Sequence, residues 1–244
     1  MLCRLQAGYG KTNTALCQDR ANVNVNANVN ANPNSHCSMN QVPRDANALL
    51  GRTVAQWRAT AEMDIQPDLL LFSYGSLIWR PDFDFVASCA ARVQGHHRSL
   101  RMRSRTNRGC PQQPGLVLAL LSGGSCRGLV FRVAAAQAQS VLSLLWAREM
   151  PSGVYEPRWL NCSTAAGPVR ALAFTLSRQS PSWTGEIADA DLLHIFRHAK
   201  GRYGTTLDYL QRTVQGLREH GIRDRELERQ LQLAVRHGLV HGLP

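Results

Sequence analysis

One carboxylate draws attention because of its position relative to apolar residues earlier in the chain. Glu149 ends a segment of helical pattern that starts near Ala135, and the residues four, seven and eleven positions before it are Leu145, Leu142 and Ala138. In a helix these positions share one face, so we expect Glu149 on the apolar stripe and not on the solvated side. A carboxylate placed there is costly unless it is protonated, paired or used in a reaction.

Opposing effects set the proton affinity of this carboxyl. Loss of water and the negative end of the helix dipole both raise the pKa of Glu149, whereas the neighbouring Arg148 lowers it. If the first two effects prevail, Glu149 is a general acid or base near neutral pH. The alternative is that Glu149 is only the ion-pair partner of one of the many arginines.

A glycine turn at the end of an apolar strand is the second candidate. The stretch DLLLFSYGSLIWRPDF, residues 68–83, runs from a buried strand into Tyr74, Gly75, Ser76 and Leu77. Successive backbone amides in such a turn can form a nest that holds a carboxylate or phosphate, and the Ser76 hydroxyl adds a donor. A plain turn beside a buried tyrosine is the ordinary alternative.

Other nucleophiles and cofactor sites have little support in the sequence. Ser76 lies outside any GxSxG motif, and the chain has neither a Walker loop nor GxGxxG. His96 and His97 alternate across an expected strand, so only one can face a cleft, and an ordinary hydrogen-bonded histidine is expected for both. The seven cysteines are scattered without the spacing of a zinc site, at positions 3, 17, 37, 89, 110, 126 and 162.

The chain is strongly basic, with a formal net charge of +11 and a pI near 10.0. A function in binding nucleic acid or an acidic partner would explain this, and the clearest cationic run is Arg98, Arg101, Arg103, Arg105 and Arg108. No recognition helix, RRM or OB signature surrounds that run, so nucleic-acid binding is not expected as the main function. An anionic small-molecule substrate explains a basic cleft equally well, and for any single arginine we expect solvated surface charge.

The order of elements predicts an α+β fold with a small, closed sheet. With 244 residues, one compact domain with an appendage is the default. A helical segment between the fourth and fifth strands carries Glu149. The expected strands are at 69–74, 91–101, 116–121, 127–133, 157–163 and 169–176, and helices follow from about residue 188.

The ends of the chain differ from this dense pattern. Residues 1–45 are rich in Asn and poor in large apolar side chains, so we expect a disordered leader, or a mis-assigned start. Residues 46–67 are expected to be an accessory helix, capped by Asp45, with a linker, and 236–244 a tail. We expect no signal peptide and no membrane span, and reduced thiols in a cytoplasmic protein.

Five ordered segments resemble one known family. They are YGSLIWRPDF (74–83), RGCPQQPGLVLAL (108–120), GGSCRGLVFRV (123–133), WAREMPSGVYEPRWL (146–160) and GRYGTTLDYL (201–210). In order and spacing they are similar to the ChaC family, the glutathione-specific γ-glutamylcyclotransferases, and to its bacterial branch in particular. The resemblance covers roughly residues 68–235, which we take as the catalytic domain.

The resemblance implies a small β-barrel-like mixed sheet flanked by helices, and an enzyme without metal or organic cofactor. The implied reaction is that of a lyase: the α-amine of a γ-glutamyl group attacks its own γ-carbonyl and releases 5-oxoproline, with Cys-Gly as the second product from glutathione. Glu149 falls on the family's catalytic glutamate. The substrate loop falls on Tyr74, Gly75, Ser76 and Leu77, and the tyrosine of GxxGxxxxYL on Tyr209.

Several alternatives stay open at this point. Tyr155, shortly after Glu149, either lines the pocket or is an ordinary half-buried aromatic. The same chemistry could act on other γ-glutamyl amino acids or amines. The Asn-rich leader, the helix from 46 and the arginine-rich RSLRMRSRTNRG (98–109) depart from the family pattern, and the sequence does not decide the oligomeric state, with a monomer one compatible state.

Overall fold

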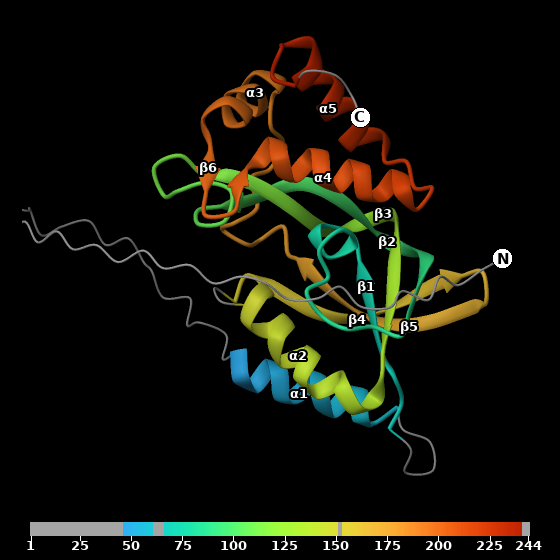
Figure 1. Cartoon of the computed structure of the whole chain (residues 1–244). Helices are drawn as coiled ribbons and strands as arrows, with labels where there is room; N and C mark the ends of the chain where they lie inside the picture. The colour runs from blue at the N-terminus through green and yellow to red at the C-terminus, as the bar shows by residue number, and fades with distance from the viewer. Residues whose placement is uncertain (1–45, 61–65, 151–152, 241–244) are drawn as a thin grey trace, which may run out of the picture.

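Figure 1 shows a computed structural model of the chain, which describes residues 46–60, 66–150 and 153–240. In this part, five strands close into a barrel and α-helices lie on two sides of it. The strands are β1 (Leu69–Ser73), β2 (Ala87–Ser104), β3 (Gly115–Val133), β4 (Tyr155–Thr164) and β5 (Gly167–Leu176), with a small hairpin of β6 (Lys200–Gly201) and β7 (Gly204–Thr205). The helices are α1 (Ala46–Arg58), α2 (Ala135–Glu149), α3 (Asp189–His198), α4 (Thr206–Glu219) and α5 (Arg225–Arg236), with a 3-10 turn η1 (Ser76–Ile78).

The barrel has the strand order β1-β3-β2-β4-β5 and closes where β1 meets β5. All neighbouring pairs are antiparallel except this last one, where Leu71 pairs with Leu172 in parallel. The run LLLF in β1 is apolar on both faces because the strand lies between the barrel interior and the covering elements. The expected α+β fold with a small closed sheet is confirmed.

Two expected strands are one. The strands predicted at 116–121 and 127–133 form the single long β3, paired along its length with β2. Between the two expected strands, Gly123 and Gly124 have φ of 96° and 71°. The chain instead continues through a bulge in β3, where Gly123 and Gly124 lie opposite the single residue Gly95 of β2, whose φ is 77°.

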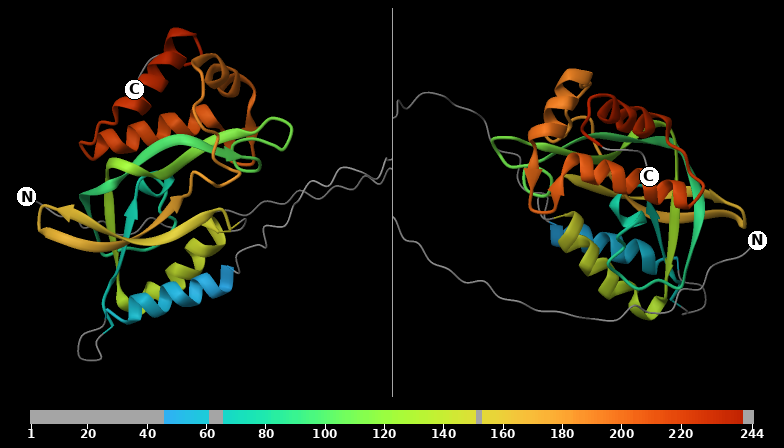
Figure 2. Two further views of the ribbon diagram at one scale, coloured as in Figure 1. Left: turned by 180° about the vertical axis from the view of Figure 1, so that it is seen from behind. Right: turned by 45° about the horizontal axis from the view of Figure 1, so that its top comes forward.

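The helices form two layers, seen from three directions in Figures 1 and 2. α1 and α2 lie together on one side of the barrel, and α3, α4 and α5 cover the other. The helix expected from residue 46 ends at Arg58. Its expected cap, Asp45, the proposed leader 1–45 and the last residues 241–244 lie outside the described residues.

The core joins both layers to the barrel. Leu120 in the barrel, Leu142 on α2 and Leu210 on α4 are all fully buried in one hydrophobic cluster. Each such side chain contributes about 1.5–3 kcal/mol by leaving water. The helices that carry the site residues are therefore fixed to the sheet by packing.

Contacts from distant residues fix helix α2 at both ends. Its first turn has no side-chain cap of its own, and the Ala135 N–H donates to the Asp68 carboxylate, 3.0 Å away, at the start of β1. Near its last turn, the Trp146 indole N–H donates to the Ala46 carbonyl of α1 at 2.8 Å. The helix that ends in Glu149 is thus held by β1 and by α1.

Candidate active site

Glu149 lies where the helical pattern predicts. Ala138, Leu142 and Leu145 are buried on the inner face of α2, and the Glu149 side chain follows them at 18% exposure. Burial raises the pKa of Glu149, and the nearby Arg148 guanidinium partly offsets this. The carboxyl is therefore poised closer to neutral pH than an ordinary glutamate.

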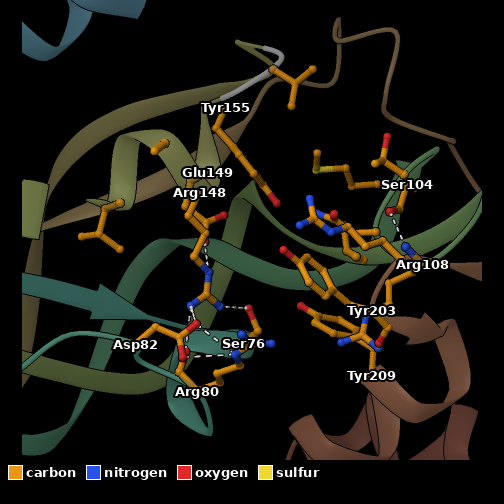
Figure 3. A pocket seen from close by; sticks show the side chains of 18 of the residues that line it. Ser76, Arg80, Asp82, Ser104, Arg108, Arg148, Glu149, Tyr155, Tyr203 and Tyr209 are labelled. Carbon is orange, nitrogen blue, oxygen red and sulfur yellow. Dashed lines mark hydrogen bonds and ion pairs between the residues drawn. The ribbon is translucent and has the colours of Figure 1, made fainter. Parts of the chain in front are cut away.

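The ion-pair alternative is also realised, because Arg148 Nε lies 3.2 Å from Glu149 Oε1. The same guanidinium donates to Ser76 Oγ and to Asp82 Oδ2, each at 2.9 Å. Figure 3 shows Arg148 reaching from α2 toward Ser76 and Asp82, with Glu149 beside it. Arg148 thus ties the carboxylate to the glycine turn; its proximity to Glu149 was visible in the sequence, but its contact with the turn was not.

A buried arginine, Arg98, fixes the start of the turn after β1 by hydrogen bonds to backbone carbonyls. The Arg98 side chain, 1% exposed, donates to the carbonyls of Tyr74 at 2.6 Å and Arg127 at 2.9 Å, and its Nε forms an ion pair with Asp224 at 3.0 Å. Arg98 is therefore structural, and our expectation of solvated surface charge was wrong for it. Arg108, also buried, contradicts the same expectation.

Gly75 is required at its position by a close approach. A Cβ atom on Gly75 would lie 2.9 Å from the hydroxyl of Tyr209, which projects from the first turn of α4. That turn is fixed by a capping box between Thr205 and Asp208. Beyond Gly75, the N–H groups of Ser76 and Leu77 donate to no acceptor within the described residues, so they are available to a ligand.

Three buried tyrosines, one of them the first residue of the turn, line the same cavity as Glu149. The hydroxyl of Tyr74 donates to the Phe174 carbonyl at 2.8 Å, and that of Tyr155 to the Leu118 carbonyl at 3.4 Å. The Tyr209 oxygen accepts from the Leu118 N–H at 3.4 Å. Burial raises the pKa of all three hydroxyls, that of Tyr209 to about 12, so they stay protonated and neutral.

These groups surround a small cavity, which we call the inner chamber. Its volume is about 40 Å³, and all seven residues predicted for the site line it. The lining residues are Phe72, Ser73, Tyr74, Gly75, Ser76, Leu77, Leu118, Glu149, Tyr155, Phe174 and Tyr209. Tyr155 therefore lines the pocket, whereas the chemical roles proposed for these residues stay predictions.

A larger cavity, the outer cleft, adjoins the inner chamber. It has a volume of about 760 Å³ and shares Ser76, Glu149, Tyr155 and Tyr209 with the chamber. In Figure 3, Glu149 and Arg148 lie on one side of this space and Tyr203, Tyr209 and Arg108 on the other. Residues that line only the outer cleft, such as Tyr203, carried no catalytic signal in the sequence.

One polar atom in the chamber wall has no partner. The Oγ of Ser73, a buried residue, forms no hydrogen bond within the described part of the chain. Buried hydroxyls are ordinarily paired, so this atom is suited to a polar ligand in the chamber.

The two adjacent histidines lie outside both cavities. The His97 ring hydrogen-bonds the Gly123 carbonyl at 2.8 Å, as expected of an ordinary histidine. For His96, the buried Nδ1 has no side-chain partner in the residues described, and burial lowers the pKa of the ring while a backbone contact with Gln94 partly offsets this.

Residues 46–60, 66–150 and 153–240 contain no group of three His, Cys, Asp or Glu side chains that could hold a metal ion. No helix in these ranges is long and apolar enough to cross a bilayer.

Comparisons with known proteins point to one family. A family model described as ChaC-like protein matches residues 69–237. The chain is 32% identical over 188 residues to the glutathione-specific γ-glutamylcyclotransferase of Escherichia coli K12, which covers 75% of this chain and 81% of that protein. It is 30% identical over 149 residues to the human glutathione-specific γ-glutamylcyclotransferase 1, covering 59% of this chain and 67% of that one.

A solved structure has the same fold. The crystal structure of a yeast γ-glutamylcyclotransferase specific to glutathione superposes with a TM-score of 0.64 at 18% identity, covering 70% of this chain and 97% of that chain. The match of the family model over most of the chain, together with these relatives, shows that the chain belongs to the ChaC family.

Proposed function

We propose that the protein is a glutathione-specific γ-glutamylcyclotransferase, with Glu149 as its general acid and base. The α-amine of the γ-glutamyl group attacks its own γ-carbonyl carbon. A new C–N bond closes the five-membered ring of 5-oxoproline, and the amide C–N bond to cysteine breaks to release Cys-Gly. The attacking ammonium gives up two protons in becoming the ring amide N–H, and the departing amide nitrogen takes up two in becoming the ammonium of Cys-Gly. Protons therefore balance and no water is consumed.

One observation carries this proposal: a carboxylate with a raised pKa lies in the wall of a small chamber, beside a turn with free amides. The names of the E. coli and human relatives support the choice of glutathione. A base of raised pKa is suited to take a proton from an ammonium and to return it to the leaving amine. General acid–base catalysis of this kind contributes about 10²- to 10⁴-fold.

Charge that develops on the carbonyl oxygen during attack needs hydrogen-bond donors. Tyr209 is suited to this because its oxygen already accepts from the Leu118 N–H, while its own proton has no acceptor among the described residues. The N–H groups of Ser76 and Leu77 are further donors next to it. Donors fixed before the reaction begins stabilise such an oxyanion without reorganisation.

The small size of the inner chamber favours cyclisation. Nucleophile and electrophile belong to the same molecule, so the protein must mainly fold the glutamyl chain into a ring-like conformation. The chamber, about 40 Å³ and lined by three tyrosines and Phe174, shares four lining residues with the outer cleft, so the glutamyl head would bend where the two cavities meet. The unpaired Ser73 hydroxyl is available to one of the polar groups of the glutamyl head.

The same chamber would accept other γ-glutamyl compounds, because it contacts only the glutamyl head. Smaller γ-glutamyl amino acids or amines are therefore the second candidate substrates.

A role in binding nucleic acid or an acidic partner has less support, because the cleft arginines surround a cavity of small-molecule size. A cytoplasmic location is part of the proposal and rests on the thiols of Cys110, Cys126 and Cys162, which form no disulfide within the described residues.

The test is product analysis with the purified full chain. The protein is incubated with millimolar glutathione, and in parallel with a γ-glutamyl amino acid and a γ-glutamyl amine, while 5-oxoproline is quantified by mass spectrometry. We expect equimolar 5-oxoproline and Cys-Gly, formed fastest from glutathione. Faster turnover of a compound without Cys-Gly would favour the second candidate, and no product from any of them would refute the proposal.

A further inference from the structure

One wall of the outer cleft is rich in positive charge. We call it the arginine wall, formed by Arg103, Arg105, Arg108 and Arg202. The first three come from the end of β2 and the segment after it, and the fourth from the β6–β7 hairpin. Backbone bonds at 2.8 Å and 2.9 Å, from Arg202 N to the Thr106 carbonyl and from Tyr203 N to the Asn107 carbonyl, join the two segments.

The carboxylates of the cleft are already engaged with other arginines. Asp82 pairs with Arg80 and with Arg148, each at 2.9 Å, and Glu149 pairs with Arg148 at 3.2 Å. Among the described residues, no arginine of the wall forms an ion pair with any carboxylate. The cleft therefore carries an excess of positive charge concentrated on this wall, which favours an anionic ligand.

Arg108 shows that this charge is costly without a ligand. The residue is only 7% exposed, and its Nη1 donates to the Tyr203 and Thr205 carbonyls, while the guanidinium lies over the Tyr209 ring at 5.2 Å from its centroid. The neighbouring Asp208 carboxylate accepts from the Thr205 N–H in the capping box instead. Burial lowers the pKa of Arg108, and the nearby Asp208 carboxylate offsets this only in part, so an anion arriving in the cleft would stabilise the buried cation further.

The outer cleft is large enough to hold the part of the substrate that carries this anion. At about 760 Å³ it is much larger than the inner chamber, where the glutamyl head would react. The rest of the substrate must extend into the cleft. Two further residues in extended conformation reach about 7 Å, so a peptide such as Cys-Gly would carry its carboxylate out of the chamber into the cleft.

We propose that the arginine wall binds the terminal carboxylate at the peptide end of the substrate, and so selects γ-glutamyl peptides over γ-glutamyl amines. This rests on the proposed cyclotransferase function and extends it to a specificity site. Arg103 and Arg105 are exposed and reach the ligand from solvent, whereas Arg108 is the buried anchor. In Figure 3, Arg108 lies across the cavity from Glu149, so the two ends of the substrate would be held on opposite sides.

A comparison of two substrates tests the site. Glutathione and its C-terminal amide have the same glutamyl head and differ only in the terminal carboxylate. We expect the wild type to prefer glutathione by kcat/KM, and the double variant Arg103→Gln/Arg105→Gln to lose about tenfold of that preference, the size expected for charge-assisted hydrogen bonds. Both arginines are exposed, so folding is not at risk.

The matched control is Arg92→Gln/Arg170→Gln, which removes two exposed arginines outside the cleft. It makes the same change in net charge, and the preference for glutathione should stay at the wild-type value. If Arg103→Gln/Arg105→Gln keeps the wild-type preference, or lowers kcat/KM equally for both substrates, the inference is wrong.

Binding separates this inference from the proposed function. In a Glu149→Gln background, calorimetric titration with glutathione and with the amide measures the site without turnover. If loss of Arg103 and Arg105 weakens the binding of glutathione about tenfold but leaves the binding of the amide unchanged, the inference about the arginine wall is supported. This conclusion holds even if the wild type forms no 5-oxoproline, because that result would refute only the proposed reaction. If the Glu149→Gln protein binds glutathione and its amide with equal affinity, the proposed role of the arginine wall is wrong.

Discussion

The inner chamber and the arginine wall belong to adjoining cavities, but they treat polar groups in opposite ways. In the chamber, Tyr74, Tyr155 and Tyr209 are buried and stay protonated, and burial raises the pKa of Glu149. On the wall, charge is fixed and has no carboxylate partner within the described residues. The difference suggests a division of labour: changes in the chamber should lower turnover, and changes on the wall should lower affinity for a peptide substrate.

The largest effect is expected for Glu149→Gln. Removing the base should lower kcat by about 10²- to 10⁴-fold, because glutamine cannot accept the ammonium proton. Turnover of glutathione by this variant, measured as 5-oxoproline formed, checks the prediction. A rate within a few fold of the wild type would remove Glu149 from the chemistry.

The same variant should not lose stability at neutral pH. Because burial raises the pKa of Glu149 in the folded state, this group stabilises the fold at low pH, and that stabilisation is lost as the pH rises through the folded pKa. Glu149→Gln should therefore keep or raise the Tm at pH 8, and its advantage should shrink near pH 4. A markedly lower Tm at pH 8 would mean that the loss of activity reflects unfolding.

Tyr209→Phe is expected to have the next largest effect. Loss of one donor to a developing oxyanion costs about 10²- to 10³-fold in kcat. Steady-state kinetics should show this loss in kcat with little change in KM. A pure increase in KM would instead place the Tyr209 hydroxyl in ground-state binding.

Gly75→Ala tests the close approach between the turn and α4. The new Cβ would lie 2.9 Å from the Tyr209 hydroxyl, so one of them must shift, and we expect about a tenfold loss of kcat from the displaced donors. Gly51→Ala is the control, since nothing lies within 4 Å of a Cβ there and alanine favours helix α1. Equal activity of the two variants would show that the turn tolerates the displacement.

The smallest effect is a shift in pH profile for Arg148→Gln. The guanidinium lowers the pKa of Glu149, so its removal should move the rising acidic limb of kcat/KM to higher pH. Arg148→Lys keeps the positive charge and should stay closer to the wild-type profile. A limb that moves to lower pH in Arg148→Gln would show that Glu149 is not the group that titrates.

Local pattern predicted the positions of the chamber residues and the closed sheet, but not which strands pair to close it. Spacing along α2 was enough to place Glu149 on the buried face, and the apolar run before Tyr74 was enough to place the turn at a strand end. Closure of the barrel depends on the pairing of Leu71 with Leu172, far apart in sequence, which no local pattern contains.

Long-range polar contacts were equally hidden. Arg98 is separated by 126 residues from its partner Asp224, so its burial could not be read from a run of alternating arginines. Asp68 caps α2 from 67 residues away, where a local cap was absent. In both cases the two partners come into contact only when the chain has folded. For this reason, the sequence alone led us to expect a solvated surface charge for Arg98.

The most direct test of the central claim is the reaction of the full chain with glutathione in H₂¹⁸O. Intramolecular attack consumes no water, so the account predicts equimolar Cys-Gly and unlabelled 5-oxoproline. Release of glutamate carrying ¹⁸O in its γ-carboxylate would contradict it, because water and not the glutamyl amine would then be the nucleophile.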